Sequence, residues 1–260
     1  MTDRADAGTG RFEDDSIYSG DCRRLMKEIP DNSIDLIITD PPFAIGFKAR
    51  RGNYNRTGAR VLDGYQEVDP SNYGAFTSAW ITEAYRVLKE TGSMYVFSGW
   101  NNLKDILIAL DDAGFVTINH LIWKYQFGVF TKRKYVTSHY HIPFVVKDAK
   151  NYTFNKVEHY PEDVWVIKRE YWTGKQKTPT KLPLALVSKI LRFSSDEGDL
   201  VLDPFLGSGT VAVAAKVMNR RYLGFEVVED YCDFARTRLE EVETGSAQQE
   251  CMGDDGVPTA

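Results

Sequence analysis

The chain has 260 residues, 43% of them apolar, and a formal net charge of −5 at pH 7. This length and apolar content can bury one sizeable core, so we expect one domain with an inserted segment rather than two independent domains. No apolar run approaches the roughly 18 residues of a membrane-spanning helix, and the first residues have no secretory signal character. The three cysteines, Cys22, Cys232 and Cys251, are scattered and form neither a disulfide framework nor a metal-ligand pair, which fits a reducing cytoplasm.

The net charge is a sum of regions with opposite signs. Residues 46–60 hold five lysines and arginines and no acid, and residues 124–181 hold twelve against five acids. Residues 226–260 instead hold ten acids and two arginines. A basic surface on an acidic remainder is compatible with binding a polyanion, because phosphate contacts are local. Charge runs are also ordinary solvated faces, so charge alone does not decide between these interpretations.

The N-terminal part predicts a tail, a strand and a short helix. Residues 1–15 are small and polar, which is typical of a disordered tail. Residues 16–20 predict a short strand, and a helix follows from Cys22 to about Ile29. Asp21 precedes that helix and is a good N-cap, because its carboxylate can accept a first-turn N–H. We expect Cys22 to be a buried neighbour rather than a nucleophile.

The stretch Asp40-Pro41-Pro42-Phe43 follows a predicted buried strand, residues 34–39, which is apolar and rich in β-branched side chains. Two prolines in a row form a rigid turn that cannot continue a sheet ladder. The Asp40 carboxylate is therefore held at the sheet edge, beside main-chain carbonyls that are free to accept hydrogen bonds. With the ring of Phe43, the stretch offers acceptors for an amino group and a face for a flat heterocycle. A strand followed by an ordinary Pro-rich turn is the alternative for this stretch alone.

Alternating helices and strands follow. Residues 44–69 have weak periodicity and predict a mobile basic loop beginning beside Asp40, with a disordered surface excursion as the alternative. A helix is expected over 73–89, then a turn at Thr91-Gly92, a strand over 93–98, a helix over 102–113 that Gly114 ends, and a strand over 115–123. This alternation is typical of an α/β fold with a mostly parallel sheet covered on both faces.

Residues 124–177 form the predicted insertion. Aromatic and basic side chains alternate near its start, a composition that suits contacts to phosphates and to unstacked bases. They are Tyr125, Phe127, Phe130, Lys132, Arg133, Lys134 and Tyr135. Residues 140–147 alternate like another strand of the main sheet. His139 and His141 are not expected to bind a metal, because no carboxylate or cysteine stands at ligand spacing.

A second motif, Asp203-Pro204-Phe205-Leu206-Gly207-Ser208-Gly209-Thr210, lies between a predicted strand (199–202) and a predicted helix (211–216). A glycine-rich turn in this context lets the backbone approach a ligand and leaves helix N–H groups facing it. The next predicted strand, 221–225, ends at Glu226, where doubly wound folds commonly hold a ribose. No Gly-Lys-Ser/Thr follows the loop, which argues against a P-loop.

Together the two motifs resemble those of the S-adenosylmethionine-dependent DNA amino methyltransferases, which modify the exocyclic amine of adenine or cytosine. Residues 40–43 are similar to the catalytic tetrapeptide of that family and residues 203–210 to its cofactor motif. The catalytic motif comes first, by roughly 160 residues, as in the permuted β class. The resemblance covers residues 16–238 and implies a Rossmann-like doubly wound catalytic domain, residues 16–240, with a short inserted target-recognition segment and an acidic disordered tail, residues 241–260.

The resemblance also implies roles for single residues. Asp40, Pro41, Pro42 and Phe43 would form the catalytic site, where Asp40 and the Pro41 carbonyl accept the N–H groups of the target amine. S-adenosylmethionine would be held by Asp21, Cys22, Asp40, Thr180, Lys181, Asp203, Pro204, Phe205, Gly207, Ser208, Gly209, Thr210, Glu226 and Val227. No metal is implied, since methyl transfer from a sulfonium needs none.

The implied partner is double-stranded DNA. Contacts to it are expected from the 44–69 loop and the insertion, through Lys48, Arg50, Arg51, Arg56, Lys132, Arg133 and Lys134. Many relatives of the β class pair into homodimers, so a homodimer is one possible partner of this chain. A cognate restriction endonuclease is another possible partner, whose presence the sequence does not decide. The expected location is the cytoplasm, at the nucleoid.

Alternatives remain open for the target base and for the class of reaction. An Asp before the two prolines resembles the adenine-specific members, whereas Ser is commoner in cytosine-N4 enzymes, yet a carboxylate can accept from either amine. Methyltransferases of RNA or of protein glutamine share a similar tetrapeptide but carry the motifs in the opposite order. A non-catalytic, Rossmann-like DNA-binding or cofactor-sensing protein is another alternative, and the intact acids at Asp40, Asp203 and Glu226 argue against such a loss of activity. A nicotinamide dehydrogenase would need a different glycine fingerprint.

Overall fold

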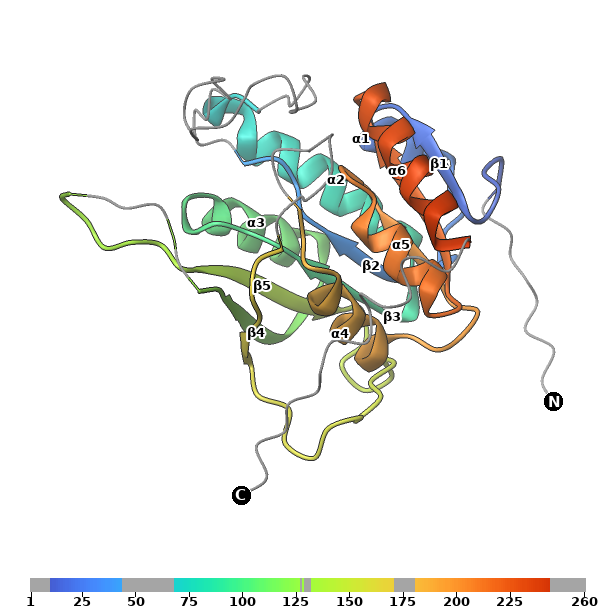
Figure 1. The fold of residues 1–260 in the computed structure, drawn as a ribbon. Coiled ribbons are helices and arrows are strands. Elements are labelled where there is room, and N and C mark those ends of the chain that lie inside the picture. The colour runs from blue at the N-terminus through green and yellow to red at the C-terminus, as the bar shows by residue number, and fades with distance from the viewer. Residues whose placement is uncertain (1–9, 44–67, 127, 129–131, 171–180, 244–260) are drawn as a thin grey trace.

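The computed structural model describes residues 10–43, 68–126, 128, 132–170 and 181–243. In this part of the chain one eight-stranded sheet forms the centre, with the strand order β1-β8-β7-β2-β3-β5-β4-β6 (Figure 1). The strands are β1 (Ser16–Ser19), β2 (Ile34–Thr39), β3 (Leu88–Val96), β4 (Val116–Lys124), β5 (His139–Val146), β6 (Val164–Val166), β7 (Leu200–Asp203) and β8 (Arg221–Glu226). Only β5 runs antiparallel to its neighbours among these strands, which confirms the predicted mostly parallel sheet.

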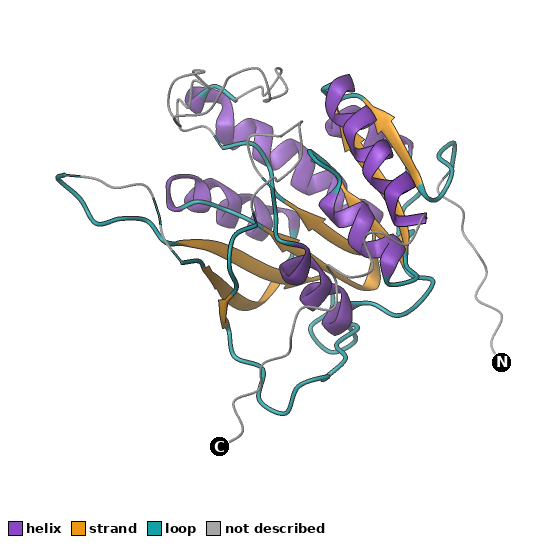
Figure 2. Cartoon of the chain, viewed as in Figure 1, coloured by secondary structure: helices purple, strands orange, loops and turns teal. Residues whose placement is uncertain are grey.

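Helices cover both faces of the sheet (Figure 2). One face packs against α4 (Leu184–Ser194), α5 (Thr210–Val217) and α6 (Glu229–Glu243), and the other against α1 (Cys22–Leu25), α2 (Tyr73–Val87) and α3 (Trp100–Ala113). Short 3-10 turns lie at Met26–Glu28 and Pro70–Asn72. This doubly wound arrangement is the one predicted. No helix within the described ranges has both the length and the apolar character to cross a membrane.

Strand β2 shows why the sequence folds this way. Side chains alternate across a strand, so Leu36 and Ile38 join the core under α4 and α5, while Ile37 joins the core under α2. Ile34 also joins the core under α2, out of step with this alternation, and the pairing of β2 with β3 shifts register between Ile34 and Leu36. All four are fully buried. A continuous apolar run is therefore needed, because both faces of the strand are covered.

The predicted disordered tail is too long. Phe12 is 4% exposed, and its ring packs on Tyr18 at 4.8 Å and on Phe225 at 5.3 Å between centroids. Residues 10–15 therefore belong to the folded unit, and residues 1–9 lie outside the described part. At the other end α6 continues to Glu243, three residues past the predicted domain limit of 240.

Two further boundaries differ from prediction. The expected helix over 73–89 ends at Val87, and β3 runs through the expected turn at Thr91-Gly92. A Cβ on Gly92 would lie 2.7 Å from the Leu88 side chain and 2.9 Å from the Asp35 carbonyl. The glycine thus allows close strand contact rather than a reversal of the chain. Strand β6, inside the insertion, was not predicted, because three residues are too few to show a period.

Candidate functional site

The two sequence motifs meet at the carboxyl edge of the sheet. Strands β2 and β7 are parallel neighbours, with Ile37 opposite Leu202, so Asp40 and Asp203 leave the sheet side by side. The hydroxyl of Thr39 donates to Oδ1 of Asp203 over 3.1 Å and ties the two strand ends together. The parallel pairing therefore joins segments 164 residues apart into one site.

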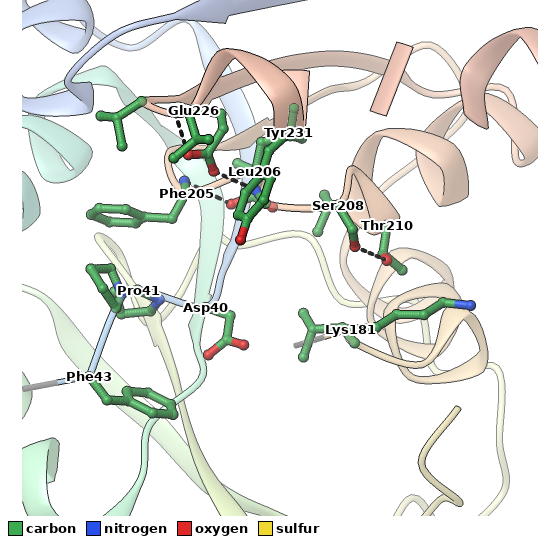
Figure 3. Close-up of a pocket in the computed structure, with 17 residues that line it drawn as sticks. Asp40, Pro41, Phe43, Lys181, Phe205, Leu206, Ser208, Thr210, Glu226 and Tyr231 are labelled. Atoms are coloured by element: carbon green, nitrogen blue, oxygen red, sulfur yellow. Dashed lines mark hydrogen bonds between the residues drawn. The ribbon is translucent and has the colours of Figure 1, made fainter. Parts of the chain in front are cut away.

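A cavity with about 900 Å³ of empty volume lies at this edge (Figure 3). Residues from both motifs, from the start of α4 and from α6 line it: Asp40, Pro41, Pro42, Phe43, Lys181, Leu182, Asp203, Phe205, Leu206, Gly207, Ser208, Thr210, Val211, Glu226, Val227, Val228 and Tyr231. Tyr231 is a lining residue that the sequence reasoning missed, because a tyrosine in an amphipathic helix carries no signal of its role.

Asp40 presents a free acceptor to this region. Its Oδ1 is buried and has no hydrogen-bond partner among the described residues. Burial raises the pKa of the Asp40 carboxyl to about 7, and the positive charge of Arg169 acts in the opposite direction. A buried acceptor without a donor is costly, so Asp40 is poised to accept a hydrogen bond from a bound group.

Asp203 is buried, and its Oδ1 is engaged in hydrogen bonds within the chain. Its Oδ1 accepts from the Thr39 hydroxyl and from the N–H of Phe205, both over 3.1 Å. Burial raises the pKa of Asp203 to about 8, and the charges of Asp40 and Glu226 add to that rise. The two hydrogen bonds lower the pKa but do not offset burial.

The glycine-rich loop is built around Glu226. The N–H of Gly207 donates to one oxygen of Glu226 and the N–H of Val228 to the other, each over 2.9 Å. Gly209 has φ = 78° and is the N-cap of α5. A Cβ at Gly209 would lie 2.6 Å from the Cβ of Ala235, so this glycine lets α6 pack against the loop. Two Glu226 lone pairs are used here, and a carboxylate has capacity for more.

A second cavity, of about 1170 Å³, adjoins the first. Both cavities are lined by Pro42, Phe205, Glu226 and Val227. The second also reaches the end of β1 and the start of α1, where it is lined by Gly20, Asp21, Cys22, Arg23, Val68, Asp69, Asn72, Ala75, Phe76, Pro204 and Phe225. The two cavities thus contain the described residues predicted to hold the cofactor, except Gly209.

Asp21 is the helix N-cap, as predicted. Its Oδ1 accepts from the N–H of Arg23 over 2.9 Å, and its carboxylate pairs with the Arg23 guanidinium. That pairing lowers the pKa of Asp21. Cys22 is 3% exposed and its thiol pKa is raised by burial, so it is a buried neighbour and not a nucleophile, also as predicted.

Other predicted residues lie differently or outside the described part. Lys181 lines the cavity, but its ammonium pairs with Glu170 over 2.7 Å and its side chain points away from Asp40 (Figure 3). Residues 132–134 are exposed on the connection between β4 and β5, which projects from the sheet in Figure 1. Outside the described residues lie Lys48, Arg50, Arg51, Arg56 and Thr180.

The structure adds Tyr140 and Arg169 to the neighbourhood of Asp40. The Tyr140 ring stacks on Phe43, with centroids 5.7 Å apart and an interplanar angle of 30°. The sequence interpretation treated Tyr140 as part of a structural strand. Its position becomes visible only once β5 is known to run antiparallel, which brings the start of β5 to the same edge as the end of β2.

Comparisons with known proteins agree with this geometry. The family model described as DNA methylase, N6_N4_Mtase, matches residues 34–237. The type II methyltransferase M.HpaI of Haemophilus parainfluenzae is 31% identical over 246 residues, covering 87% of this chain and 74% of the relative. The type II methyltransferase M.HinfI of Haemophilus influenzae is 34% identical over 251 residues, covering 87% and 68%.

A solved structure is similar over most of its length. The complex of M1.HpyAVI with S-adenosylmethionine matches with a TM-score of 0.65 and 25% identity, covering 86% of this chain and 98% of that one. The residues that the family model matches, 34–237, include both motifs.

Proposed function

This chain belongs to the N6/N4 family of DNA methylases, and on that premise we propose that it methylates the N6 amino group of an adenine extruded from double-stranded DNA. At the coarser level it is a site-specific DNA methyltransferase of the type II restriction-modification class, with S-adenosylmethionine as its cofactor. The observation that carries the proposal is the buried Oδ1 of Asp40, a residue that lines the cavity, for which the described part of the chain offers no hydrogen-bond partner.

The chemistry of the two cavities fits S-adenosylmethionine. The cavities are lined by acidic groups, which suits a molecule that carries amines and hydroxyls: Asp203 is proposed to bind the methionine amine, Glu226 the ribose hydroxyls and Asp21 the adenine amine. Phe205 lines both cavities. When bound, the cofactor supplies an electrophilic methyl group on a sulfonium.

The chain's own part in the reaction is to hold and polarise the target amine. An exocyclic amine is a poor nucleophile, because its lone pair is delocalised into the ring. Asp40 and the Pro41 carbonyl, each accepting one N–H, would draw the nitrogen toward tetrahedral geometry and stabilise the positive charge that develops on it. This stabilisation is stronger in the transition state than in the ground state. Asp40 or water would then accept the proton that the methylated nitrogen releases.

The target base must leave the duplex to reach Asp40. Phe43 is the proposed stacking surface, with Tyr140 beside it at 5.7 Å. The exposed side chains of Lys132, Arg133 and Lys134 are proposed to contact phosphates. An Asp before the two prolines, which resembles the adenine-specific members, favours adenine over cytosine.

The test is transfer of isotope-labelled methyl to unmethylated DNA, followed by digestion to nucleosides and mass analysis. We expect label in N6-methyladenine with the natural chain. Asp40→Ala should reduce transfer by about 10²–10³-fold or more, because an acceptor used in the transition state is lost. Cofactor binding by Asp40→Ala, measured by calorimetry, should persist.

The outcomes separate the parts of the proposal. Label in N4-methylcytosine would keep the mechanism and overturn the base. Undiminished transfer by Asp40→Ala would overturn the role of Asp40. Absence of label on DNA, with cofactor binding intact, would refute DNA methylation under these conditions.

A further inference from the structure

Arg169 lies beside the catalytic motif, although it belongs to the insertion. Its guanidinium carbon stands 3.9 Å from the ring centroid of Tyr125, 5.5 Å from that of Tyr140 and 5.9 Å from that of Trp123. Its Nε is buried and has no hydrogen-bond partner among the described residues. A guanidinium on aromatic faces is held in a fixed place while keeping its charge.

The backbone around Arg169 is anchored at the end of β4. The indole N–H of Trp123 donates to the Ile167 carbonyl over 2.8 Å, and the N–H of Arg169 donates to the side-chain oxygen of Gln126 over 2.8 Å. On the other side, Glu170 accepts from the N–H of Leu184 at the start of α4 over 2.7 Å. Arg169 is therefore placed by contacts to two core elements.

Tyr140 connects Arg169 to the catalytic motif. Its ring stacks on Phe43, and its hydroxyl is hydrogen-bonded to Arg169. Burial and the negative charge of Asp40 raise the pKa of Tyr140 above its usual value, so the phenol stays neutral. The cluster thus presents one positive charge, that of Arg169, on the insertion side of Asp40.

The other ionisable groups around Asp40 do not neutralise it. Asp203 from β7 is a buried acid, and Glu226 from β8 is a half-buried one. Lys181, ahead of α4, pairs with Glu170 and points away (Figure 3). From α6, Tyr231 brings a phenol to the cavity lining.

We propose that Arg169 is a positioning residue that keeps Asp40 in the carboxylate form needed to accept the target amine. This inference rests on the function proposed above. A protonated Asp40 would carry an O–H donor on one oxygen and would lose acceptor capacity toward the amine. The placement of Arg169 beside Tyr140, which stacks on Phe43, agrees with the direction of its electrostatic effect. Among the described residues, Arg169 is the one cation whose charge lowers the pKa of Asp40. The insertion would then supply part of the catalytic electrostatics as well as a candidate DNA surface.

The first test needs neither cofactor nor DNA. The carboxyl ¹³C resonance of Asp40, assigned by its loss in Asp40→Asn, is titrated in the natural chain, Arg169→Met, Arg169→Lys and Lys168→Met. Methionine keeps the length and apolar stem of Arg169 without its charge. Lys168 is the exposed neighbour and serves as the control for net charge.

We expect Arg169→Met to raise the titration midpoint of Asp40 by about one pH unit or more, as loss of a nearby opposite charge does. Arg169→Lys should recover most of the shift, and Lys168→Met should leave the midpoint unchanged. An Asp40 midpoint that is the same in Arg169→Met and the natural chain would overturn the inference. If Arg169→Met does not fold, Arg169→Lys and a salt titration of the Asp40 midpoint decide, because a screened cation loses its effect.

The second test is the pH profile of single-turnover methyl transfer with cofactor and DNA saturating. Arg169→Met should lose about tenfold more activity at a pH one unit below its own midpoint than at high pH, and should approach the natural rate at high pH. An equal loss at every pH would show a merely structural role and refute the inference. Since the carboxyl titration does not use activity, failure of the proposed reaction and failure of this inference remain distinguishable.

Discussion

The carboxylates in the two halves of the sheet's carboxyl edge differ in their hydrogen-bond partners. On the side of β1, β7 and β8, Asp21, Asp203 and Glu226 each accept hydrogen bonds from backbone N–H groups of the chain itself. On the side of β2, Asp40 has an oxygen with no partner among the described residues. The first arrangement fixes the orientation of the carboxylates, whereas the second leaves one acceptor oxygen for a substrate.

This difference has a physical basis. A carboxylate held by backbone donors keeps its orientation and can still accept further bonds from a ligand. An unpartnered buried acceptor is destabilising on its own, so its cost is offset only when a donor arrives. The contrast supports the proposal that the first side recognises the cofactor and the second binds the transition state.

Among the carboxylates on the side of β1, β7 and β8, the largest effect on stability and cofactor binding is expected from Asp203→Asn. The pKa of Asp203, about 8 in the folded chain, exceeds the ordinary value of 3.8, so the folded state holds a proton that the unfolded chain releases between these pH values. The contribution of Asp203 to stability is thus present at low pH and lost as pH rises through this window. Asn removes the charge and keeps the acceptor oxygen, so we expect the cofactor-free variant to be more stable at pH 9 by a few kcal/mol.

The same substitution should weaken cofactor binding by about tenfold or more, because a charge-assisted hydrogen bond to the cofactor amine is lost. Urea unfolding at pH 5 and pH 9, with calorimetric cofactor binding, measures both effects. The exposed Asp112→Asn on α3 controls for net charge. Unchanged cofactor affinity would exclude Asp203 from cofactor binding.

A smaller difference, in the free energy of unfolding, is expected between alanine variants of the two loop glycines, Gly207 and Gly209. Gly207 has φ = 51°, and a Cβ there would meet only the Phe205 carbonyl, at 3.9 Å. Gly207→Ala should therefore cost about 1–2 kcal/mol from backbone strain alone. Gly209→Ala adds a clash with Ala235 at 2.6 Å and should cost about 1–3 kcal/mol more. Equal unfolding free energies for the two variants would contradict the packing role of Gly209.

The smallest effect concerns the exposed basic residues between β4 and β5. Lys132→Gln and Arg133→Gln should each weaken DNA binding modestly and lower the slope of log K against log[salt] by about one unit if they contact phosphates. Their cofactor affinity should equal that of the natural chain. Lys156→Gln, an exposed charge on the connection after β5, is the matched control. If all three variants have the same salt slope, this projection does not contact DNA.

Local sequence patterns anticipated much of the fold. Three features follow from the conformational preferences of neighbouring residues, which can be read from the sequence. They are the buried strand before Asp40, the glycine-rich loop between β7 and α5, and the N-cap at Asp21. The same holds for the strand ending at Glu226. Boundaries were less secure where tertiary contacts override local preference, as at Gly92 inside β3 and at Phe12 in the core.

The chemical groups of the protein, and their positions at the ends of strands, can be read from the amino-acid sequence, because strand periodicity and turn residues are local properties. Which of these groups face one another depends on how the strands pair in the folded chain. The charge of Arg169 acts on Asp40 because β6 pairs with β4 and β5 is antiparallel, and no spacing in the sequence encodes that pairing. The unpartnered state of the Asp40 oxygen is likewise a property of the assembled edge, since burial and hydrogen bonding are set by residues distant in the chain.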